Sequence, residues 1–385
     1  MNLRTLWIPS WYPHKGQLFY GSFVYRQALA TSQFCEIAVL YVIESEDTEM
    51  VMEETQINSN FFQLIIYIPK NKWRIGKFVQ LMQAYRSGWK RLKELNKKPQ
   101  ITHLHVVYPS GVFALWLHWI QQIPFVISEH WTGYRKAAGD FKGWFLKGLI
   151  GQSIKQSKRV ITVSNQASLA MQQHGLAGDY MVLPNVVDVK NAPKKPAKFT
   201  EKCHFIHVSS LEDRHKNITG LLTVLKELTK VRKDFFLEII GGNPVAHREY
   251  FEQKVREMDL ESHVQFTGLI PNEQMLSRLA AADVFVLFSN FEGLPCSMLE
   301  AMAVGLPVIT TEIGDMNKWV TEEVGRLIEI CDEAALLTAL IHMLDHHQTY
   351  DGEKIRKRII DTCGYEVVGK KIVSIYEEVL ETNLI

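Results

Sequence analysis

Short apolar runs alternate with longer amphipathic stretches along most of the chain. Leu3–Pro9 and Val284–Phe288 are bounded by polar residues or proline, and Phe236–Ile240 ends at two glycines. Runs of this length are typical of buried parallel strands. Between such runs, apolar residues recur at helical spacing, as in Ile218–Val231. Strands that alternate with helices in this way predict the α/β class.

The longest stretch without Asp, Glu, Lys or Arg runs from Ile101 to Ser128. It is long enough to cross a membrane as a helix. Histidines, prolines and a glycine interrupt it, however, and it divides more naturally into two strands, Ile101–Val107 and Phe125–Ser128, with a helix at Gly111–Gln121. We therefore expect buried strands here.

The 385 residues exceed what one hydrophobic core usually holds, so two domains are expected. Residues 190–198, rich in proline and lysine, are predicted to form the hinge. Residues 44–60 are acidic and predicted to be turn-like. The first residues lack a long apolar segment, so a cleaved signal peptide is not expected.

The net charge of +1 hides an asymmetry between the two halves. Residues 1–190 carry 21 basic and 12 acidic side chains, whereas residues 191–385 carry 22 basic and 30 acidic side chains. Residues 70–98 hold ten basic residues and only one acid, among apolar residues at helical spacing, and residues 135–159 are again basic around Trp144. Both segments suit an anionic membrane surface, although a solvated outer helix would have the same composition.

The five cysteines are scattered and include no CxxC pair, which suits a reducing cytosol and indicates no structural zinc site. The first loop lacks GxGxxG, so dinucleotide binding has no support. No metal, cofactor or nucleic-acid partner is predicted.

Residues 284–312 predict a complete strand–turn–helix–strand unit. An apolar strand leads into a turn with Gly293 and Pro295, a short helix follows, and a second strand begins after Gly305. The loop after such a strand and the first turn of the helix favour anions, because free N–H groups and the helix dipole point there. Two carboxylates, Glu292 and Glu300, frame the turn.

This stretch, Glu292-Gly-Leu-Pro-Cys-Ser-Met-Leu-Glu300-Ala-Met-Ala-Val-Gly-Leu-Pro-Val, resembles the donor-sugar motif of family 4 retaining glycosyltransferases. The resemblance implies the GT-B fold: two Rossmann-like domains facing a cleft, with a C-terminal helix crossing back to the first domain. It implies an acceptor-side domain at 1–188, a nucleotide-sugar-binding domain at 189–364 and the returning helix at 365–385. Val182-Leu-Pro-Asn-Val-Val-Asp188 resembles the strand that ends the first domain, with Val186 replacing the usual glycine.

The resemblance also implies roles for individual residues. Glu292 with the N–H groups of Gly293 and Leu294 would hold the sugar and phosphate, and Glu300 would bind the ribose. Lys216 matches the family's lysine for the diphosphate; Ser210 stands where an arginine is usual, and Arg214 is the candidate replacement.

In the first domain, two further residues match the family. Gly21 would let the backbone approach the diphosphate, and an ordinary loop glycine is the alternative. His130 would line the cleft near the transferring sugar, although a lone histidine is more often structural.

The predicted function is transfer of a sugar from a UDP- or GDP-linked donor to a hydroxyl, with retention at the anomeric carbon. The acceptor is expected to be a glycan or a lipid-linked or surface-polysaccharide precursor, and the location cytoplasmic, with peripheral contact to the inner face of the plasma membrane. An epimerase or phosphorylase of the same fold and an inactive membrane scaffold are the alternatives. A phosphorylase would need a pyridoxal-binding lysine, for which the sequence has no signal.

Overall fold

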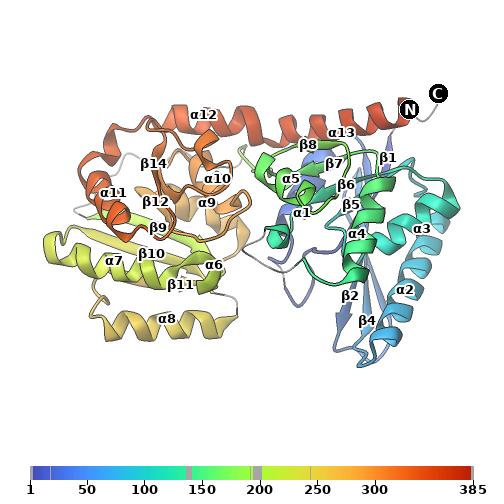
Figure 1. Cartoon of the computed structure of the whole chain (residues 1–385), viewed down its shortest axis with the longest axis horizontal. Coiled ribbons are helices and arrows are strands. Elements are labelled where there is room, and N and C mark those ends of the chain that lie inside the picture. Colours follow the sequence, from blue (N-terminus) through green and yellow to red (C-terminus); the bar gives the residue numbers. More distant parts are fainter. Residues whose placement is uncertain are drawn as a thin grey trace. The chain divides into compact units, whose positions relative to one another are not determined.

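The computed structural model describes residues 3–17, 19–135, 141–190, 192–193, 202–242 and 244–382. The chain forms two compact units (Figure 1). Unit 1 comprises Met1–Val186 and Tyr365–Ile385, and unit 2 comprises Val187–Gly364. Each unit has its own sheet with helices on both faces, which confirms the predicted α/β class. Of the expected hinge at 190–198, residues 191 and 194–198 lie outside the described residues.

Unit 1 contains an eight-stranded sheet in the order β3-β4-β2-β1-β5-β6-β7-β8. Its strands are β1 (Arg4–Pro9), β2 (Glu36–Ser45), β3 (Val51–Asn58), β4 (Phe61–Pro69), β5 (Ile101–His105), β6 (Phe125–Glu129), β7 (Val160–Thr162) and β8 (Tyr180–Val182). All neighbours are parallel except β3 and β4. The prediction that residues 44–60 form only turns was wrong, because they end β2 and make the antiparallel edge strand β3.

The uncharged stretch 101–128 forms β5, a helix and β6, as predicted. Within the described residues no helix combines the length and apolar character needed to cross a membrane.

Helices cover both faces of this sheet. One face carries α2 (Arg74–Glu94), α3 (Gly111–Gln121), α4 (Trp144–Gln156) and α5 (Asn165–Gln172), and the other carries α1 (Ser22–Thr31) and α13 (Tyr365–Thr382). Side chains of β1 alternate between the two faces of the sheet. Leu6 and Ile8 pack in the layer that contains α2, α3, α4 and α5, and Trp7 packs in the layer that contains α1 and α13.

The C-terminal helix α13 packs closely against α1. A Cβ added at Gly369 would lie 2.5 Å from the backbone oxygen of Ala30, so only glycine fits at this crossing. Ile372 and Tyr376 are fully buried in the same layer. The last helix of the chain is therefore part of the core of unit 1, as the predicted fold class required.

Unit 2 contains a six-stranded parallel sheet in the order β11-β10-β9-β12-β13-β14. Its strands are β9 (Cys203–Ser209), β10 (Phe235–Gly241), β11 (Val264–Gly268), β12 (Val284–Leu287), β13 (Val308–Thr311) and β14 (Gly325–Ile328). Its helices are α6 (Asp213–Lys216), α7 (Ile218–Val231), α8 (Val245–Glu257), α9 (Asn272–Ala281), α10 (Cys296–Ala303), α11 (Glu333–His346) and α12 (Gly352–Cys363), with short 3₁₀ turns η2 (Met316–Lys318) and η3 (His347–Thr349).

The strand order of unit 2 creates a topological switch point between β9 and β12. From β9 the chain first builds outward through β10 and β11, and then restarts on the other side with β12, β13 and β14. Loops that leave β9 and β12 diverge at their carboxyl ends, and open α/β sheets bind ligands at such a point. The candidate site of unit 2 is built there.

Candidate functional site

The site of unit 2 consists of two loops at the carboxyl ends of β9 and β12. The first runs from Ser209 through the single-turn helix α6 into α7. The second runs from Phe288 to Pro295 and enters α10. The backbone N–H of Asn290 donates to the carbonyl of His215 at 2.8 Å, and the Asn290 side chain donates to the carbonyl of Arg214 at 3.2 Å. The two loops are therefore held together.

Lys216 and Glu292, both predicted from the sequence, form an ion pair in this site. The Lys216 ammonium donates to Oε1 of Glu292 at 2.5 Å, and their side chains are only 19% and 8% exposed. The hydroxyl of Ser289 donates to the same carboxylate oxygen at 2.7 Å. A pair so shielded from water is poorly screened, which makes it responsive to a third charged group.

Ser289 is in turn held by the neighbouring strand β13. The hydroxyl of Thr311 donates to the carbonyl of Ser289 at 2.7 Å, and both side chains are fully buried. The orientation of the Glu292 carboxylate is therefore fixed from two sides, by a lysine from the β9 loop and by a serine anchored to β13.

His207 fixes the start of the other loop and was not singled out from the sequence. Burial lowers the pKa of His207 to about 4, so the ring is neutral near pH 7. Its Nδ1–H donates to the carbonyl of Val286 at 2.9 Å, and Nε2 accepts from the hydroxyl of Ser209 at 2.8 Å. Ser209 Oγ then accepts from the N–H of Leu211, whose backbone is left-handed. A single buried ring thus joins β12 to the loop that carries Lys216.

Arg214 and Lys216 lie on the same single-turn helix. Asp213, which begins it, accepts hydrogen bonds from the N–H and the hydroxyl of Thr219 in α7. Asn217 caps α7 by accepting from the N–H of Gly220. Arg214 is exposed. The structure therefore places two cations in one rigid turn at the carboxyl end of β9, and the replacement of the usual arginine by Arg214 stays a prediction.

Gly293, Leu294 and Glu300 lie at and just beyond the entry to α10. Leu294 is buried, Gly293 is half-buried, and Pro295 has extended backbone immediately before the first helical residue. The first turn of α10 leaves N–H groups without intrahelical partners and carries the positive end of the helix dipole. Glu300 lies on α10 at a half-buried position. Their proposed contacts with a donor stay predictions.

Gly21, the candidate diphosphate-binding glycine of unit 1, has a structural reason to be glycine. Its backbone is left-handed with φ of 64°, and it forms the N-cap of α1. A Cβ at this position would lie 2.4 Å from the carbonyl carbon and oxygen of Trp11. The close crossing of two loop segments accounts for the glycine, and contact with a phosphate stays a prediction.

His130 follows β6 in unit 1 and extends a row of buried aromatic rings. Its ring lies 4.5 Å from Phe23 between centroids and is stacked on His105 at 6.2 Å. His105 and His103 are 4.0 Å apart, and His103 bonds to Tyr376 at 2.6 Å and to Ser128 at 2.8 Å. Burial lowers the pKa of His130 to about 3. A neutral ring is suited to hydrogen bonding and not to carrying positive charge.

Glu129, which sequence reasoning passed over, holds the loop that carries His130. It is buried at the end of β6, and burial raises the pKa of its carboxyl. It accepts hydrogen bonds from the N–H groups of Val107, His130 and Trp131 and from the hydroxyl of Tyr134. An acidic residue directly after a buried strand was its only sequence signal.

The basic segments of unit 1 expose large apolar side chains at the starts of two helices. Trp73 and Ile75, at the start of α2, are 80% and 81% exposed, and Trp144, at the start of α4, is 86% exposed. The second half of α2 differs, because Tyr85, Trp89 and neighbouring apolar residues are buried against the sheet. Only the beginning of the predicted amphipathic helix therefore presents apolar surface to solvent. Residues 136–140 of the second segment lie outside the described part of the chain.

Comparisons with known proteins identify the family. Residues 188–361 match the model for glycosyl transferases group 1, and residues 38–191 match the model for glycosyltransferase family 4. Together the matches run over most of both units. The chain therefore belongs to the family 4-type, group 1 glycosyltransferases.

Curated relatives include several bacterial transferases. The putative teichuronic acid biosynthesis glycosyltransferase TuaC of Bacillus subtilis is 27% identical over 290 residues, covering 72% of this chain and 68% of TuaC. N-acetyl-alpha-D-glucosaminyl L-malate synthase of Bacillus anthracis is 26% identical over 301 residues, covering 74% of this chain and 76% of that synthase. A GDP-mannose-dependent monoacylated phosphatidylinositol monomannoside mannosyltransferase of Corynebacterium glutamicum is 27% identical over 216 residues, 51% of this chain. The match spans only 55% of that mannosyltransferase, about half its length.

Solved structures share the fold along the whole chain. Sucrose-phosphate synthase from Thermosynechococcus elongatus has a TM-score of 0.80 at 19% identity, covering 98% of this chain and all of that one. Anabaena HepE in complex with UDP and glucose has a TM-score of 0.75 at 13% identity, with the same coverage. The chain thus has the predicted GT-B fold of two Rossmann-like domains.

Proposed function

We propose that this glycosyltransferase moves a hexosyl unit from a UDP- or GDP-linked donor to a hydroxyl, with retention at the anomeric carbon. The observation that carries the proposal is the shielded Lys216–Glu292 pair at the switch point of unit 2. The pair places a cation for the diphosphate and a carboxylate for sugar hydroxyls at one edge of the sheet.

The donor would exchange partners with this pair. A diphosphate oxygen competes with Glu292 for the Lys216 ammonium, and the carboxylate is then available to accept a hydrogen bond from a sugar hydroxyl. Glu292 remains oriented during the exchange because Ser289 still donates to Oε1. In the transition state charge grows on the departing diphosphate, and Lys216, with Arg214 on the same turn, stabilises it.

The other predicted donor contacts extend from this centre. The N–H groups of Gly293 and Leu294 and the first turn of α10 are donors for phosphate or sugar oxygens. Glu300, further along α10, is assigned to the ribose hydroxyls. In unit 1, Gly21 would approach the diphosphate, and His130, as a neutral ring, would hydrogen-bond the transferring sugar.

The acceptor is proposed to be a glycan or a lipid-linked or surface-polysaccharide precursor. The names of two relatives support this class, since one refers to a phosphatidylinositol monomannoside and the other to teichuronic acid biosynthesis. The proposal includes reversible docking of unit 1 on anionic lipid through the exposed starts of α2 and α4, on the cytoplasmic side of the membrane.

The choice of nucleotide is tested by thermal shift with UDP, GDP and their sugar conjugates. A ligand that binds only the folded state raises the melting temperature, by several degrees at about 100 times its dissociation constant. We expect one nucleotide series to shift the chain, with a smaller shift for Lys216→Ala. If no nucleotide moved the melting temperature, the assignment of this donor site would fail.

Product analysis separates the alternatives. Incubation with the selected nucleotide sugar and a hydroxyl acceptor should give a glycoside whose anomeric configuration, measured by NMR coupling constants, equals that of the donor. An epimerase would instead change the nucleotide sugar without an acceptor, and an inactive scaffold would bind membranes without turnover. An inverted product would refute retention while leaving transfer intact.

A further inference from the structure

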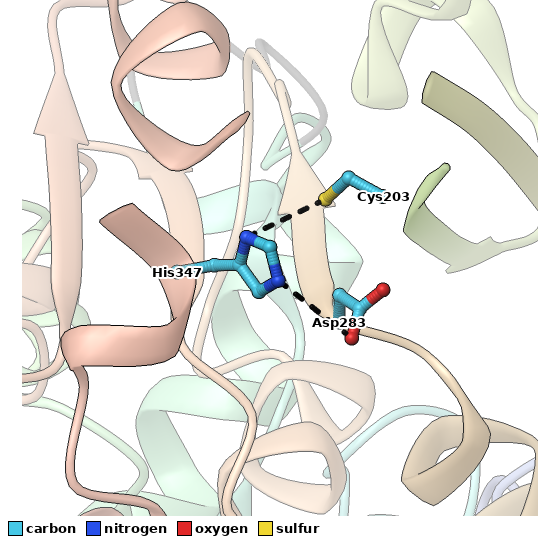
Figure 2. A group of neighbouring side chains, drawn as sticks. All are labelled: Cys203, Asp283 and His347. Carbon is cyan, nitrogen blue, oxygen red and sulfur yellow. Dashed lines mark hydrogen bonds and ion pairs between the residues drawn. The ribbon is translucent and has the colours of Figure 1, made fainter. Parts of the chain in front are cut away.

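At the opposite edge of the sheet of unit 2, three potential metal ligands converge. Cys203 begins β9, Asp283 immediately precedes β12, and His347 begins η3 after α11. Figure 2 shows the imidazole between the thiol and the carboxylate. The Cys203 sulfur lies 3.9 Å from Nδ1 of His347, and Oδ1 of Asp283 lies 3.9 Å from Nε2. One ligand atom from each residue lies within 4.8 Å of the other two.

The protein already orients two of these groups as metal ligands are usually oriented. The Nδ1 of His347 is 2.9 Å from the carbonyl of Met343, so it carries the proton and leaves the lone pair on Nε2. Asp283 accepts from the backbone N–H of His204 at 2.9 Å through Oδ2, which directs Oδ1 toward His347. Hydrogen bonds of this kind fix the tautomer and direction of ligands around bound metals.

The three groups are also shielded, which favours ligation over hydration. Cys203 and Asp283 are buried, and the side chain of His347 is 12% exposed. In a tetrahedral zinc site, bond lengths near 2.3 Å to sulfur and 2.0–2.1 Å to nitrogen or oxygen separate the ligand atoms by about 3.3–3.6 Å. In the structure the three ligand atoms lie within 4.8 Å of one another, and Oδ1 of Asp283 is 3.9 Å from Nε2 of His347. These separations are longer than in a zinc site, so binding would draw the side chains together and turn the Cys203 sulfur from Nδ1 toward Nε2 of His347.

We propose that Cys203, Asp283 and His347 bind one Zn²⁺ ion, with water in the fourth position. A thiolate, an imidazole and a carboxylate are all zinc ligands, and binding releases the thiol proton to solvent. Because the cysteines show no CxxC spacing, the sequence indicated no zinc site; here the ligands come from three separate elements brought together by the fold.

The position of the ion suggests what it does. β9 and β12 are neighbours, and the loops at their far ends carry Lys216 and Glu292. The seven residues of β9 put the ion roughly 20 Å from that edge. The zinc therefore fastens the amino ends of the two strands to the segment after α11 and takes no part in transfer. The proposal goes beyond the proposed function and does not depend on it.

Cobalt provides a direct test with the full-length chain. After treatment with a chelator and desalting, Co²⁺ titration should give one ion per chain and a thiolate-to-cobalt charge-transfer band, which Zn²⁺ then abolishes by displacement. Cys203→Ser should lose the band, and Cys331→Ser, which alters an exposed thiol of the same unit, should keep it. Absence of the band in the unaltered chain, or its survival in Cys203→Ser, would overturn the site.

Two further measurements test the site even if Cys203→Ser fails to fold. Asp283→Asn retains an acceptor for the His204 N–H, and should weaken Zn²⁺ binding by at least about 10- to 100-fold while circular dichroism remains unchanged. Zn²⁺ at about 100 times its dissociation constant should raise the melting temperature of the unaltered chain by roughly 5 °C or more, and that of Asp283→Asn by much less. Equal affinities in the two chains would exclude the carboxylate, and with it the proposed ligand set. None of these readouts uses transferase activity.

Discussion

At the scale of single residues, the site of unit 2 combines groups that sequence reasoning found with groups that it missed. Glu292 was predicted because it stands in a long motif, and Lys216 because it matches the family's lysine in the loop after β9; the structure pairs them. Ser289 and His207 were missed, because their positions are set by contacts with residues distant in the sequence, Thr311 for Ser289 and Val286 for His207. A sequence motif reveals the residues proposed to contact a ligand. It reveals less readily the residues that hold those side chains in place.

The first prediction concerns the effect of the Lys216–Glu292 pair on turnover. Lys216→Ala and Glu292→Gln should each lower turnover by at least about 100-fold, a typical loss for a charge contact in the transition state. Glu292→Gln keeps the shape of the side chain, so its effect isolates the charge. Lys230→Ala, which removes an exposed lysine from α7 in the same unit, is the matched control and should retain activity. Initial rates with the nucleotide sugar chosen by thermal shift measure all three; near-normal rates in both site variants would refute the assignment.

The buried histidines of unit 1 predict a loss of stability in mild acid. Burial lowers the pKa of His103 and of His130 to about 3, and that of His105 well below its usual value. Between about pH 6.5 and pH 3 the unfolded chain therefore binds more protons than the folded one, so stability is full above about pH 6.5 and falls as the pH drops. Each ring contributes up to about 1.4 kcal/mol per pH unit.

His105→Phe tests this because the phenyl ring keeps the stacking but takes up no proton. All tryptophans except Trp319 belong to unit 1, so tryptophan fluorescence in urea reports mainly on that unit. Between pH 7 and pH 5 the stability of His105→Phe should fall less steeply than that of the unaltered chain. His346→Phe, at an exposed position of unit 2, should leave the slope unchanged. Equal slopes in all three chains would show that the buried ring takes up no proton on unfolding.

At the scale of elements, apolar runs located the buried strands well and the exposed strand poorly. β5 and β6 were found within an uncharged stretch because both faces of a parallel sheet are covered. β3 was read as turn because none of its residues is buried and several are polar, including Glu53 and Glu54; it pairs antiparallel with β4 at the edge of the sheet. Hydropathy gives only a weak signal for an edge strand that has no fully buried residue.

The close contact between α1 and α13 predicts that alanine at position 369 lowers stability, whereas helix propensity alone predicts that it raises stability. Gly369→Ala should destabilise unit 1 by about 1–3 kcal/mol, because the added Cβ would meet the carbonyl of Ala30 at 2.5 Å. Propensity alone would favour alanine in a helix by about 1 kcal/mol. Gly148→Ala in α4 is the control. An added Cβ there has no neighbour within 4 Å beyond its own helix backbone, so this substitution should stabilise unit 1 by about 0.5–1 kcal/mol. Tryptophan fluorescence in urea measures both. Stabilisation by Gly369→Ala would show that the helices do not pack as described.

At the scale of the whole molecule, the sequence predicted two Rossmann-like domains and the element that carries the motif around Glu292 and Glu300. It placed the motif in the correct strand–loop–helix unit because glycine, proline and apolar runs are local signals. The switch point between β9 and β12 depends on strand order, which local patterns do not specify. Surface properties are also only partly readable, since Trp89 proved to be buried in the core and Trp73 exposed, although both lie in one basic segment.

That division within α2 sharpens the prediction for membrane binding. The proposed docking surface comprises Trp73 and Ile75 with the adjacent Lys72 and Arg74, together with Trp144 at the start of α4. All five side chains are exposed, and the two tryptophans and the isoleucine are at least 80% exposed. Exposed tryptophan beside basic residues suits the interface of an anionic bilayer, where each basic side chain near the surface contributes about 1 kcal/mol.

Liposome flotation measures this binding. The unaltered chain should bind vesicles containing anionic lipid, bind neutral vesicles much less, and dissociate as salt rises. The double variant Lys72→Gln, Arg74→Gln should bind about 30-fold more weakly, which corresponds to about 2 kcal/mol. Lys254→Gln, Arg256→Gln removes the same charge from α8 of unit 2 and should bind as the unaltered chain does. Equal weakening by the two double variants would indicate that net charge alone drives binding; binding independent of lipid charge and salt would refute the docking surface.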